Sequence, residues 1–402
     1  MKAPFTRSLW LPLSLLTFPY ALPAADWLQF RGPGGSSVSQ ESGLPTALSE
    51  SVLAWKSPLP GRGISSPLII GERLYVTASS GPDQDRLHVL CLSAADGTKI
   101  WERQFWATGR TMTHPKIGVA TSTPCSDGKR IFAAFSSNDV VCLDLEGGLV
   151  WMRGLTRDYP NASNSLGMAS SPLVTGDTVV FPVESDSESF AIGLNAKDGS
   201  NRWKIARPKR SNWASPVEFG GGVALLSAAG LSVVDPATGK EKWAFGGGSS
   251  TPSVTFAEGI LYVPAKGTTA LRPPSSGAEP EVIWQNNQAL CSTVSPVVHK
   301  GRLYTVNNAG ILKCSAAKDG EKVWQLRTTG PYSATPVAAG DLLYMVNEKG
   351  LVQAIDTTAP EGAVVSTLDL QDTFIGTPSI GPKALYLRSD KFLYRLGGSL
   401  GK

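Results

Sequence analysis

The chain alternates short apolar runs with turn residues along most of its length. Runs such as RLYVTAS (73–79), RIFAAFS (130–136) and GILYVPA (259–265) are rich in valine, isoleucine, leucine and tyrosine. Short runs of this composition, bounded by glycine and proline, are typical of strands, and long helical periodicity is hard to find. The pattern predicts an all-β fold, and 42 glycines and 29 prolines among 402 residues agree with frequent turns.

A longer unit repeats over these strands. Each unit starts with a small residue and a proline, passes through a glycine turn and apolar strands, and ends on a strand that carries tryptophan. The starting prolines are Pro67, Pro124, Pro172, Pro216, Pro252, Pro296, Pro336 and Pro378. The tryptophans are Trp101, Trp151, Trp203, Trp243, Trp284 and Trp324, separated by 50, 52, 40, 41 and 40 residues. A four-stranded sheet cannot bury both of its faces alone, so this period predicts blades stacked radially in a β-propeller.

The two ends of the chain predict the number of blades. After Pro378 only three strands remain, whereas LAWKSPL (53–59) places Trp55 ahead of the first unit. We therefore predict an eight-bladed β-propeller of four-stranded antiparallel blades, in which the N-terminal strand at 53–59 completes the last blade and closes the ring. Such closure removes exposed sheet edges.

A glycine turn precedes the tryptophan by four residues in most units, as in DGTKIW (96–101), DGSNRW (198–203) and DGEKVW (319–324). Glycine accepts the positive φ that a tight hairpin turn needs. We expect the tryptophans, Trp55 included, to dock against the neighbouring blade, where each indole would bury about 150–250 Å². Stacking on a ligand is the alternative role.

The N-terminus differs from the rest of the chain. Lys2 and Arg7 precede the apolar run LWLPLSLL and the small-residue stretch ALPAA (21–25), which together predict a signal peptide over 1–25 with cleavage near Ala24 or Ala25. We expect an exported protein, periplasmic or secreted, with an N-terminal extension at 26–52 and the propeller at 53–402. No other run has the length of a transmembrane segment.

The charge balance excludes some classes of binding partner, and the cysteine positions indicate a structural role. Without Lys2 and Arg7 the chain has 35 basic and 33 acidic residues, a net charge of +2, which argues against nucleic acid or an anionic membrane as partner. Of the five cysteines, Cys91, Cys142 and Cys314 share one repeated position before the turn, so we expect them to pack in the core. We expect a monomer.

The small-residue-plus-proline start, the Asp/Thr-Gly turn and the tryptophan four residues later resemble the pyrroloquinoline-quinone (PQQ)-like propeller repeat. TGKEKW (238–243) is the clearest copy, and the resemblance covers about residues 53–398. It implies a propeller fold. The family contains quinoprotein alcohol dehydrogenases and cofactor-free propellers such as the outer-membrane protein assembly factor BamB. DWLQFRGPGG (26–35) also resembles exported planctomycete-type propeller proteins.

The sequence offers few residues suited to catalysis or to binding a metal or cofactor. The dehydrogenase members of the family use adjacent cysteines over the quinone, and no two cysteines are adjacent here. The three histidines, His88, His114 and His299, show no zinc-binding spacing. We therefore expect no catalytic residue, metal or cofactor, with PQQ and calcium in a dehydrogenase-like enzyme as the alternative. The acidic run ESDSE (184–188) is expected to be a solvated loop, with a calcium site as the alternative.

Three connections between blades are candidates for a binding face at the channel mouth, namely residues 106–122, 156–170 and 206–215. The candidate ligand-binding residues on this rim are Arg110, His114, Lys116, Arg207, Arg210 and Trp213. Their cations and indole would suit an acidic peptide, a glycan or another anion. The alternative is that the cations are solvated and Trp213 packs like the other tryptophans.

The leading functional prediction is an exported, non-catalytic interaction or assembly scaffold for a protein or peptide of the cell envelope. A dehydrogenase-like enzyme is the first alternative. A carbohydrate-binding propeller is the second, and it predicts that saccharides quench the fluorescence of Trp106 or Trp213.

Overall fold

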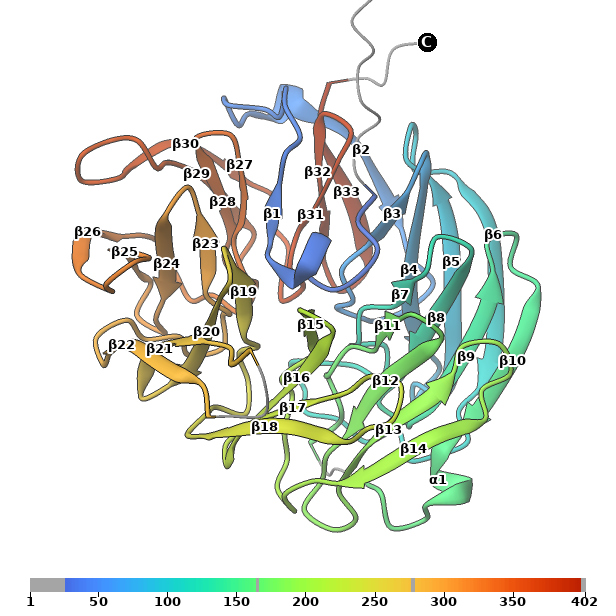
Figure 1. Ribbon diagram of the computed structural model, residues 1–402. Coiled ribbons are helices and arrows are strands. Elements are labelled where there is room, and N and C mark those ends of the chain that lie inside the picture. The colour runs from blue at the N-terminus through green and yellow to red at the C-terminus, as the bar shows by residue number, and fades with distance from the viewer. Residues whose placement is uncertain (1–25, 164–165, 276–278, 399–402) are drawn as a thin grey trace, which may run out of the picture.

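The strands form eight sheets around a central axis (Figure 1). The computed structural model describes residues 26–163, 166–275 and 279–398, so the predicted signal peptide at 1–25 lies outside the described residues. In every blade four strands run antiparallel from the axis to the rim. The predicted eight-bladed all-β propeller is therefore confirmed.

The first four blades follow one another along the chain. Blade 1 contains β3 (Leu68–Ile70), β4 (Arg73–Ser80), β5 (Arg86–Ser93) and β6 (Lys99–Trp106); blade 2 contains β7 (Cys125–Ser126), β8 (Arg130–Ala134), β9 (Asp139–Asp144) and β10 (Leu149–Gly154); blade 3 contains β11 (Leu173–Thr175), β12 (Thr178–Val183), β13 (Phe190–Asn195) and β14 (Asn201–Ala206); blade 4 contains β15 (Val217–Phe219), β16 (Gly222–Ser227), β17 (Gly230–Val234) and β18 (Glu241–Gly246).

The remaining blades continue the ring. Blade 5 contains β19 (Thr255–Ala257), β20 (Ile260–Ala265), β21 (Gly267–Arg272) and β22 (Glu281–Asn286); blade 6 contains β23 (Val297–His299), β24 (Arg302–Val306), β25 (Ile311–Ala316) and β26 (Lys322–Arg327); blade 7 contains β27 (Val337–Ala339), β28 (Leu342–Val346), β29 (Leu351–Asp356) and β30 (Ala363–Asp369), with β1 (Val38–Ser39) added; blade 8 contains β31 (Ser379–Gly381), β32 (Ala384–Arg388), β33 (Phe392–Gly397) and β2 (Leu53–Pro58). The short helices are η1 (Pro33–Gly35), η2 (Glu50–Val52) and α1 (Leu155–Asp158).

The two ends of the propeller meet in blade 8. Strand β2 pairs antiparallel with β33, with Trp55 opposite Arg395, and becomes the outermost strand of this blade. The last blade therefore takes three strands from the C-terminus and one from the N-terminus. This is the ring closure that the chain ends predict.

The repeated tryptophans lie between neighbouring blades. Trp151 on β10 of blade 2 packs over the turn of blade 3, where a Cβ at Gly199 would come within 2.7 Å of the indole. Its Nε1 donates a hydrogen bond to the carbonyl of Ala196 at 3.1 Å. The same contact joins Trp55 to Gly97, Trp101 to Gly147, Trp203 to Gly239, Trp284 to Gly320 and Trp324 to Gly362. Glycine is required in this turn for its positive φ, +72° at Gly199, and also because the neighbouring indole occupies the Cβ position. The turn expected at Gly277 lies outside the described residues.

Three of the cysteines occupy equivalent buried positions in their blades, as their spacing predicts. Cys91, Cys142 and Cys314 are fully buried, unpaired, and lie opposite the tryptophans on the outer strands, with Cys91 facing Trp101. In blade 8 the same position is Arg395. The repeated cysteine is therefore a small buried side chain between strands and forms no disulfide framework.

A series of seven hydrogen bonds joins the segments that lead into the innermost strands of successive blades. The side-chain oxygen of a serine or threonine in one blade accepts the backbone N–H of the matching residue in the preceding blade, at 2.9–3.2 Å. We call these residues the hydroxyl belt. They are Ser66, Thr123, Ser171, Ser215, Ser253, Ser295, Thr335 and Thr377. The residue before proline therefore connects the blades.

In blade 5 the sequence alignment of the repeat was wrong by two residues. The belt position is Ser253, which bonds to Ser215 and Ser295, and Val254 stands where the other blades have proline. Pro252, chosen from the motif Ser-Thr-Pro, precedes the belt. The two possible registers both begin with small hydroxyl residues, so only the hydrogen bonds distinguish them.

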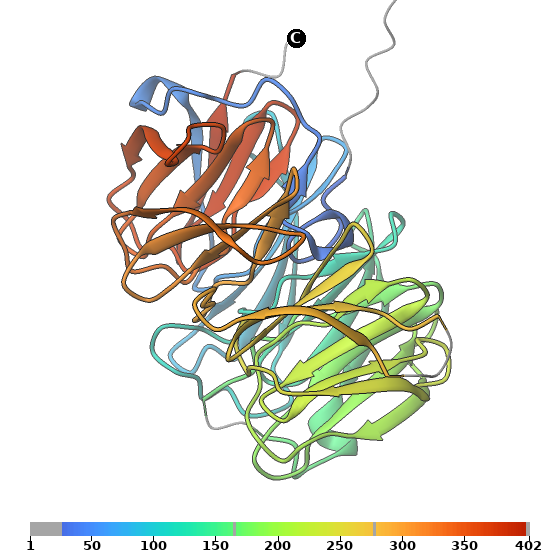
Figure 2. The same cartoon turned by 60° about the vertical axis from the view of Figure 1, so that its left-hand side comes forward.

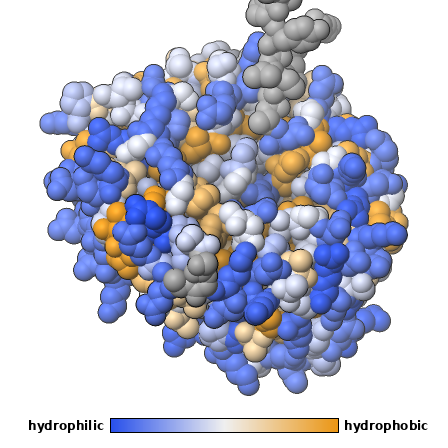
Figure 3. Space-filling view, in the orientation of Figure 1, coloured by the Kyte–Doolittle hydropathy of each residue, from blue (hydrophilic) through white to orange (hydrophobic). Residues whose placement is uncertain are grey.

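The N-terminal extension enters the central channel on the face seen in Figure 1, where η1 and β1 lie at the centre of the ring. Trp27 forms a β-bridge with Ile69 of blade 1, and Val38 pairs in parallel with Ala338 of blade 7. Figure 3 shows side chains filling the centre of this face. We call residues 26–39 the plug, because they close one end of the channel.

Arg31 holds the plug to the blades. Its side chain is fully buried and donates to Ser37, to the carbonyl of Val254 at 2.9 Å and to the carbonyl of Pro296 at 2.8 Å. Burial lowers the pKa of Arg31 to about 9. One side chain therefore ties the extension to blades 5 and 6, and its acceptors are uncharged.

The rest of the extension runs along blades 7 and 8 toward β2 (Figure 2). On blade 7, Ser366 of β30 occupies the position that carries tryptophan elsewhere, opposite Ala354. Leu48, which is 5% exposed, donates its N–H to the Ser366 hydroxyl at 2.7 Å. The extension thus covers the blade that lacks its tryptophan.

Candidate functional site

A cavity of about 350 Å³ lies on the channel axis, at the end opposite the plug. All eight residues of the hydroxyl belt line it. A second ring, two residues earlier in each blade, lines it as well. This upper ring consists of Ile64, Thr121, Ala169, Trp213, Thr251, Thr293, Ser333 and Ile375. Strand alternation places every second residue toward the axis, which is why two rings of eight form the wall.

Phe30 of the plug also lines the cavity. Because the plug enters from the other face, this phenylalanine closes the deep end, and the cavity is a blind funnel. A propeller channel would otherwise run through the disc. The floor of the candidate site therefore comes from the extension and not from a blade.

Two connections cover the wide end of the funnel, and we call residues 107–122 and 166–170 the roof. The N–H of His114 donates to the carbonyl of Leu166 at 2.9 Å, which joins the two connections. His114, Lys116, Ile117 and Leu166 all line the cavity.

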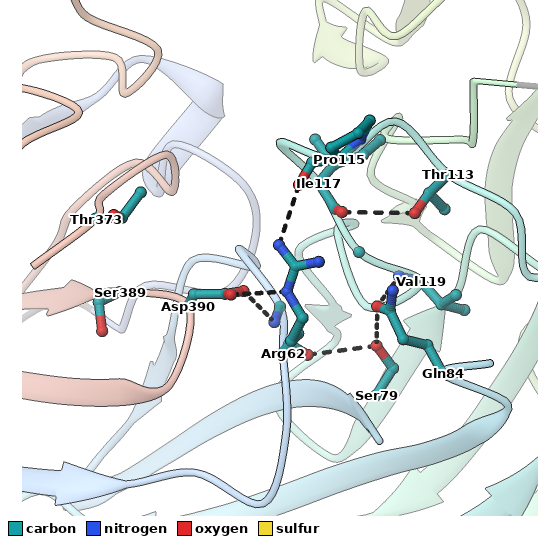
Figure 4. A network of polar contacts seen from close by, with 12 residues as sticks. Arg62, Ser79, Gln84, Thr113, Pro115, Ile117, Val119, Thr373, Ser389 and Asp390 are labelled. Carbon is teal, nitrogen blue, oxygen red and sulfur yellow. Dashed lines mark hydrogen bonds and ion pairs between the residues drawn. The ribbon is translucent and has the colours of Figure 1, made fainter. Parts of the chain in front are cut away.

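Charged groups fasten the roof to the ring (Figure 4). Arg62 forms an ion pair with Asp390 of blade 8 at 2.7 Å and donates to the carbonyl of Pro115 in the roof at 3.1 Å. Lys116 reaches Glu348 of blade 7 at 2.9 Å. The roof from blade 1 is thereby held to blades 7 and 8.

The structure places the six predicted rim residues in three different environments. His114, Lys116 and Trp213 line the funnel, and the indole Nε1 of Trp213 donates to the carbonyl of Gly167 at 2.8 Å. Arg110 and Arg210 are exposed and lie outside the lining. Their role in binding a ligand stays a prediction.

Arg207 is buried rather than on the rim. Its side chain is 6% exposed and pairs with Glu184, 1% exposed, at 2.8 Å. Burial raises the pKa of the Glu184 carboxyl, and the nearby guanidinium opposes that shift. The expectation that the whole run 184–188 is solvated is therefore wrong for Glu184, because a cation 23 residues away compensates for its burial.

The funnel offers little for catalysis. Of the described residues that line it, only His114 and Lys116 carry ionisable side chains, and Lys116 is already paired with Glu348. In the part of the chain that the structure describes, no group of three or more His, Cys, Asp or Glu is placed to hold a metal ion. The wall therefore suits binding through hydroxyl groups and apolar contacts.

The cofactor alternative can be tested against this lining. PQQ carries several carboxylates, and the calcium that accompanies it requires carboxylate or amide oxygens. Among the described residues, the lining contains one lysine as its only permanent cation, and no carboxylate, amide side chain or cysteine. These residues do not fit PQQ with calcium, so no chemical step is derived through it.

The fold and the funnel define a propeller of the PQQ-like class, and sequence comparison gives its family. The family model described as "PQQ_2: Outer membrane protein assembly factor BamB" matches residues 37–180 and 229–364, well over half of the chain. The chain belongs to this family.

Solved structures share the fold at low identity. BamB from Moraxella catarrhalis superposes with a TM-score of 0.65 at 15% identity, over 87% of this chain and 98% of that one. A europium-containing methanol dehydrogenase gives 0.70 at 14% identity, over 91% and 90%. A quinohemoprotein alcohol dehydrogenase from Comamonas testosteroni gives 0.68 at 13%, over 95% and 82%. These similarities establish the fold and leave the activity open.

A curated relative matches over a smaller region. The polyvinylalcohol dehydrogenase of Sphingopyxis sp. (strain 113P3) is 26% identical over 225 residues, which are 52% of this chain and 30% of that protein. The match thus spans less than a third of the relative's length. In this chain, no helix among the described residues is long and apolar enough to span a bilayer.

Sequence reasoning missed two parts of the site. The hydroxyl belt was visible as a repeated Ser/Thr before proline, but its role was not. Phe30 gave no signal, because nothing in the extension's composition indicates that it enters the channel. Aligning the repeats two residues further upstream would have shown the upper ring, including Trp213.

Proposed function

We propose that this protein is an exported, non-catalytic propeller that binds a protein or peptide of the cell envelope and acts as an assembly scaffold. The observation that carries the proposal is the family match to the outer membrane protein assembly factor over most of the chain. Export itself rests on the predicted signal peptide. The described residues of the funnel lining include no acid–base pair and no carboxylate, which supports a binding role.

The roof is the proposed partner face. Met112 is 52% exposed and Leu166 is 44% exposed, and both lie beside the mouth of the funnel. Exposed Arg110 and Arg210 belong to the roof and to the neighbouring connection. Apolar side chains beside cations suit a partner segment that carries acidic and apolar residues.

Site-specific cross-linking tests this face. A photo-reactive amino acid at Met112 should give one discrete adduct in intact envelopes. The same group at Val282, which is 49% exposed on the outer strand of blade 5, is the control. The double variant Arg110→Glu, Arg210→Glu should weaken the Met112 adduct several-fold. Equal labelling from both positions, or no adduct from Met112, would contradict the proposed face.

A dehydrogenase-like enzyme is the second candidate, favoured by the local match to a polyvinylalcohol dehydrogenase. The purified chain would be incubated with PQQ and calcium, with polyvinyl alcohol as substrate and an electron-accepting dye. On the scaffold proposal, the absorption spectrum of the quinone stays that of the free compound and no dye is reduced. A bound-quinone spectrum with substrate-dependent dye reduction would favour the enzyme.

A further inference from the structure

The hydrogens of the belt hydroxyls are available to a ligand. A serine or threonine hydroxyl has one hydrogen to donate and two lone pairs to accept with. In seven of the eight belt residues, a lone pair accepts a backbone N–H from the preceding blade. Within the described part of the chain, no belt hydroxyl donates to a protein acceptor. Because all eight line the cavity, they surround it with O–H donors.

The upper ring is different. Thr121 donates to the carbonyl of Gly118, Thr293 donates to the carbonyl of Tyr332 at 2.9 Å, and Ser333 donates to Glu348 at 2.7 Å. These hydroxyls are therefore engaged by the protein. Among the described residues, Thr251 is the upper-ring hydroxyl for which no such donation is found, and the belt donors lie deeper, toward Phe30.

One of the eight belt hydroxyls, at the break in the belt, has no hydrogen-bond partner at all in the described part of the chain. Among the described residues, no hydrogen bond links Thr377 to Ser66, and the Ser66 Oγ is buried without a partner. Buried polar atoms in native proteins are usually satisfied, by protein, water or ligand. Because this hydroxyl lacks even the backbone N–H that the other seven accept, it marks the wall between blades 8 and 1 as a contact point.

Apart from His114, Lys116 and the upper-ring hydroxyls, the rest of the described lining is apolar or aromatic. Ile64 and Ile375 flank the belt break, Ile117 and Leu166 lie above, and Phe30 lies below. The indole N–H of Trp213 is already bonded to Gly167. In the described part of the lining, no side chain is a carboxylate or amide that would accept hydrogen bonds from a donor-rich ligand such as a sugar.

We propose that the funnel binds a small, uncharged aromatic compound that carries a carbonyl oxygen, with this oxygen among the belt hydroxyls and the ring against the apolar wall. Its volume lies at the small end of the range of ligand pockets, which suits one or two fused rings. The site is separate from partner docking on the outside of the roof, and each can exist without the other.

Three probes of nearly one shape test the proposal on the full chain. 1-Indanone has a carbonyl, indane has no polar atom, and 1-aminoindane has a cationic donor in place of the acceptor. Titration calorimetry, followed in parallel by tryptophan fluorescence, should show saturable binding of 1-indanone. Indane should bind about tenfold more weakly, because the donors lose an acceptor, and 1-aminoindane more weakly still.

Ala169→Phe places an aromatic ring in the funnel from the upper ring and leaves every belt residue unchanged, and it should abolish 1-indanone binding. Ala206→Phe, at the exposed end of β14 and outside the lining, is the matched control and should bind normally. Equal binding of 1-indanone and indane, no saturable binding, or unchanged binding in Ala169→Phe would overturn the proposal. If Ala169→Phe does not fold, the order of the three probes on the unchanged protein still decides. Envelope cross-linking from Met112 does not depend on these results.

Discussion

Replacing Trp151 by alanine tests the contact that the repeat was built around. This indole is 8% exposed, packs over Gly199 of the next blade and donates a hydrogen bond of 3.1 Å to Ala196. Burying an indole removes about 150–250 Å² from water, which corresponds to at most about 4–6 kcal/mol. Since the cavity left behind collapses only in part, we expect Trp151→Ala to lower the free energy of unfolding by about 3–5 kcal/mol.

Trp106→Ala is the matched control. Trp106 is 60% exposed and contacts the guanidinium of Arg86, 4.0 Å from its ring centroid. An exposed cation–π contact contributes about 0.5–1 kcal/mol, so this variant should lose no more than that. Urea denaturation followed by circular dichroism and by fluorescence would compare the two variants, and coincident curves would justify two-state treatment.

A double-variant cycle sharpens the test. Gly199→Ala should also destabilise, because its Cβ would meet the Trp151 ring at 2.7 Å and because φ is +72° there. Both changes act on one contact. The loss of unfolding free energy in the double variant should therefore differ from the sum of the two single losses by about 1 kcal/mol or more. Additive losses, or a Trp151→Ala loss no larger than that of Trp106→Ala, would refute the view that this indole holds blades 2 and 3 together.

Three further predictions concern the plug, a buried ion pair and pH. Gly32→Ala should lower the free energy of unfolding by about 1–3 kcal/mol more than Gly34→Ala. Both glycines have positive φ, but only the Cβ at position 32 would clash, 2.5 Å from the indole of Trp27. The midpoints of urea denaturation curves would measure the difference. Arg207→Ala strands a buried carboxylate and should cost about 3–5 kcal/mol, whereas exposed Arg210→Ala should stay within about 0.5 kcal/mol in the same assay. Burial favours the neutral form of Glu102, but hydrogen bonds from a lysine, a histidine and a glutamine outweigh it and lower its pKa from 4.5 to about 2. The ionised Glu102 carboxylate therefore stabilises the fold fully above its ordinary pKa, and this stabilisation is lost as pH falls toward 2. The melting temperatures of the wild type and of Glu102→Gln should differ at pH 7 and converge in acid.

The sequence anticipated the parts of the fold that depend on local pattern. Alternating apolar runs, glycine turns and a tryptophan every 40–52 residues determine that each unit is a small sheet with two apolar faces. Such sheets must stack, and the surplus strand carrying Trp55 must complete the last one. These conclusions need only the neighbours along the chain and the requirement that apolar faces be covered.

The candidate site was only partly predictable. His114, Lys116 and Trp213 line the funnel because the connections that carry them pass over its mouth. Arg207 could not be told from Arg210 by sequence, because its buried partner Glu184 belongs to another segment of the blade. A charged residue in a connection has the same local pattern whether it faces solvent or a buried carboxylate.

What the sequence determined by itself was the repeating blade and the number of blades, because hydrophobic period and turn chemistry act over a few residues. What only the tertiary structure decided was how the extension is used: Phe30 becomes the floor of a blind funnel, and Arg31 reaches acceptors more than 200 residues away. Those contacts exist only once the blades have closed into a ring, since the channel that receives the plug is formed by all eight of them.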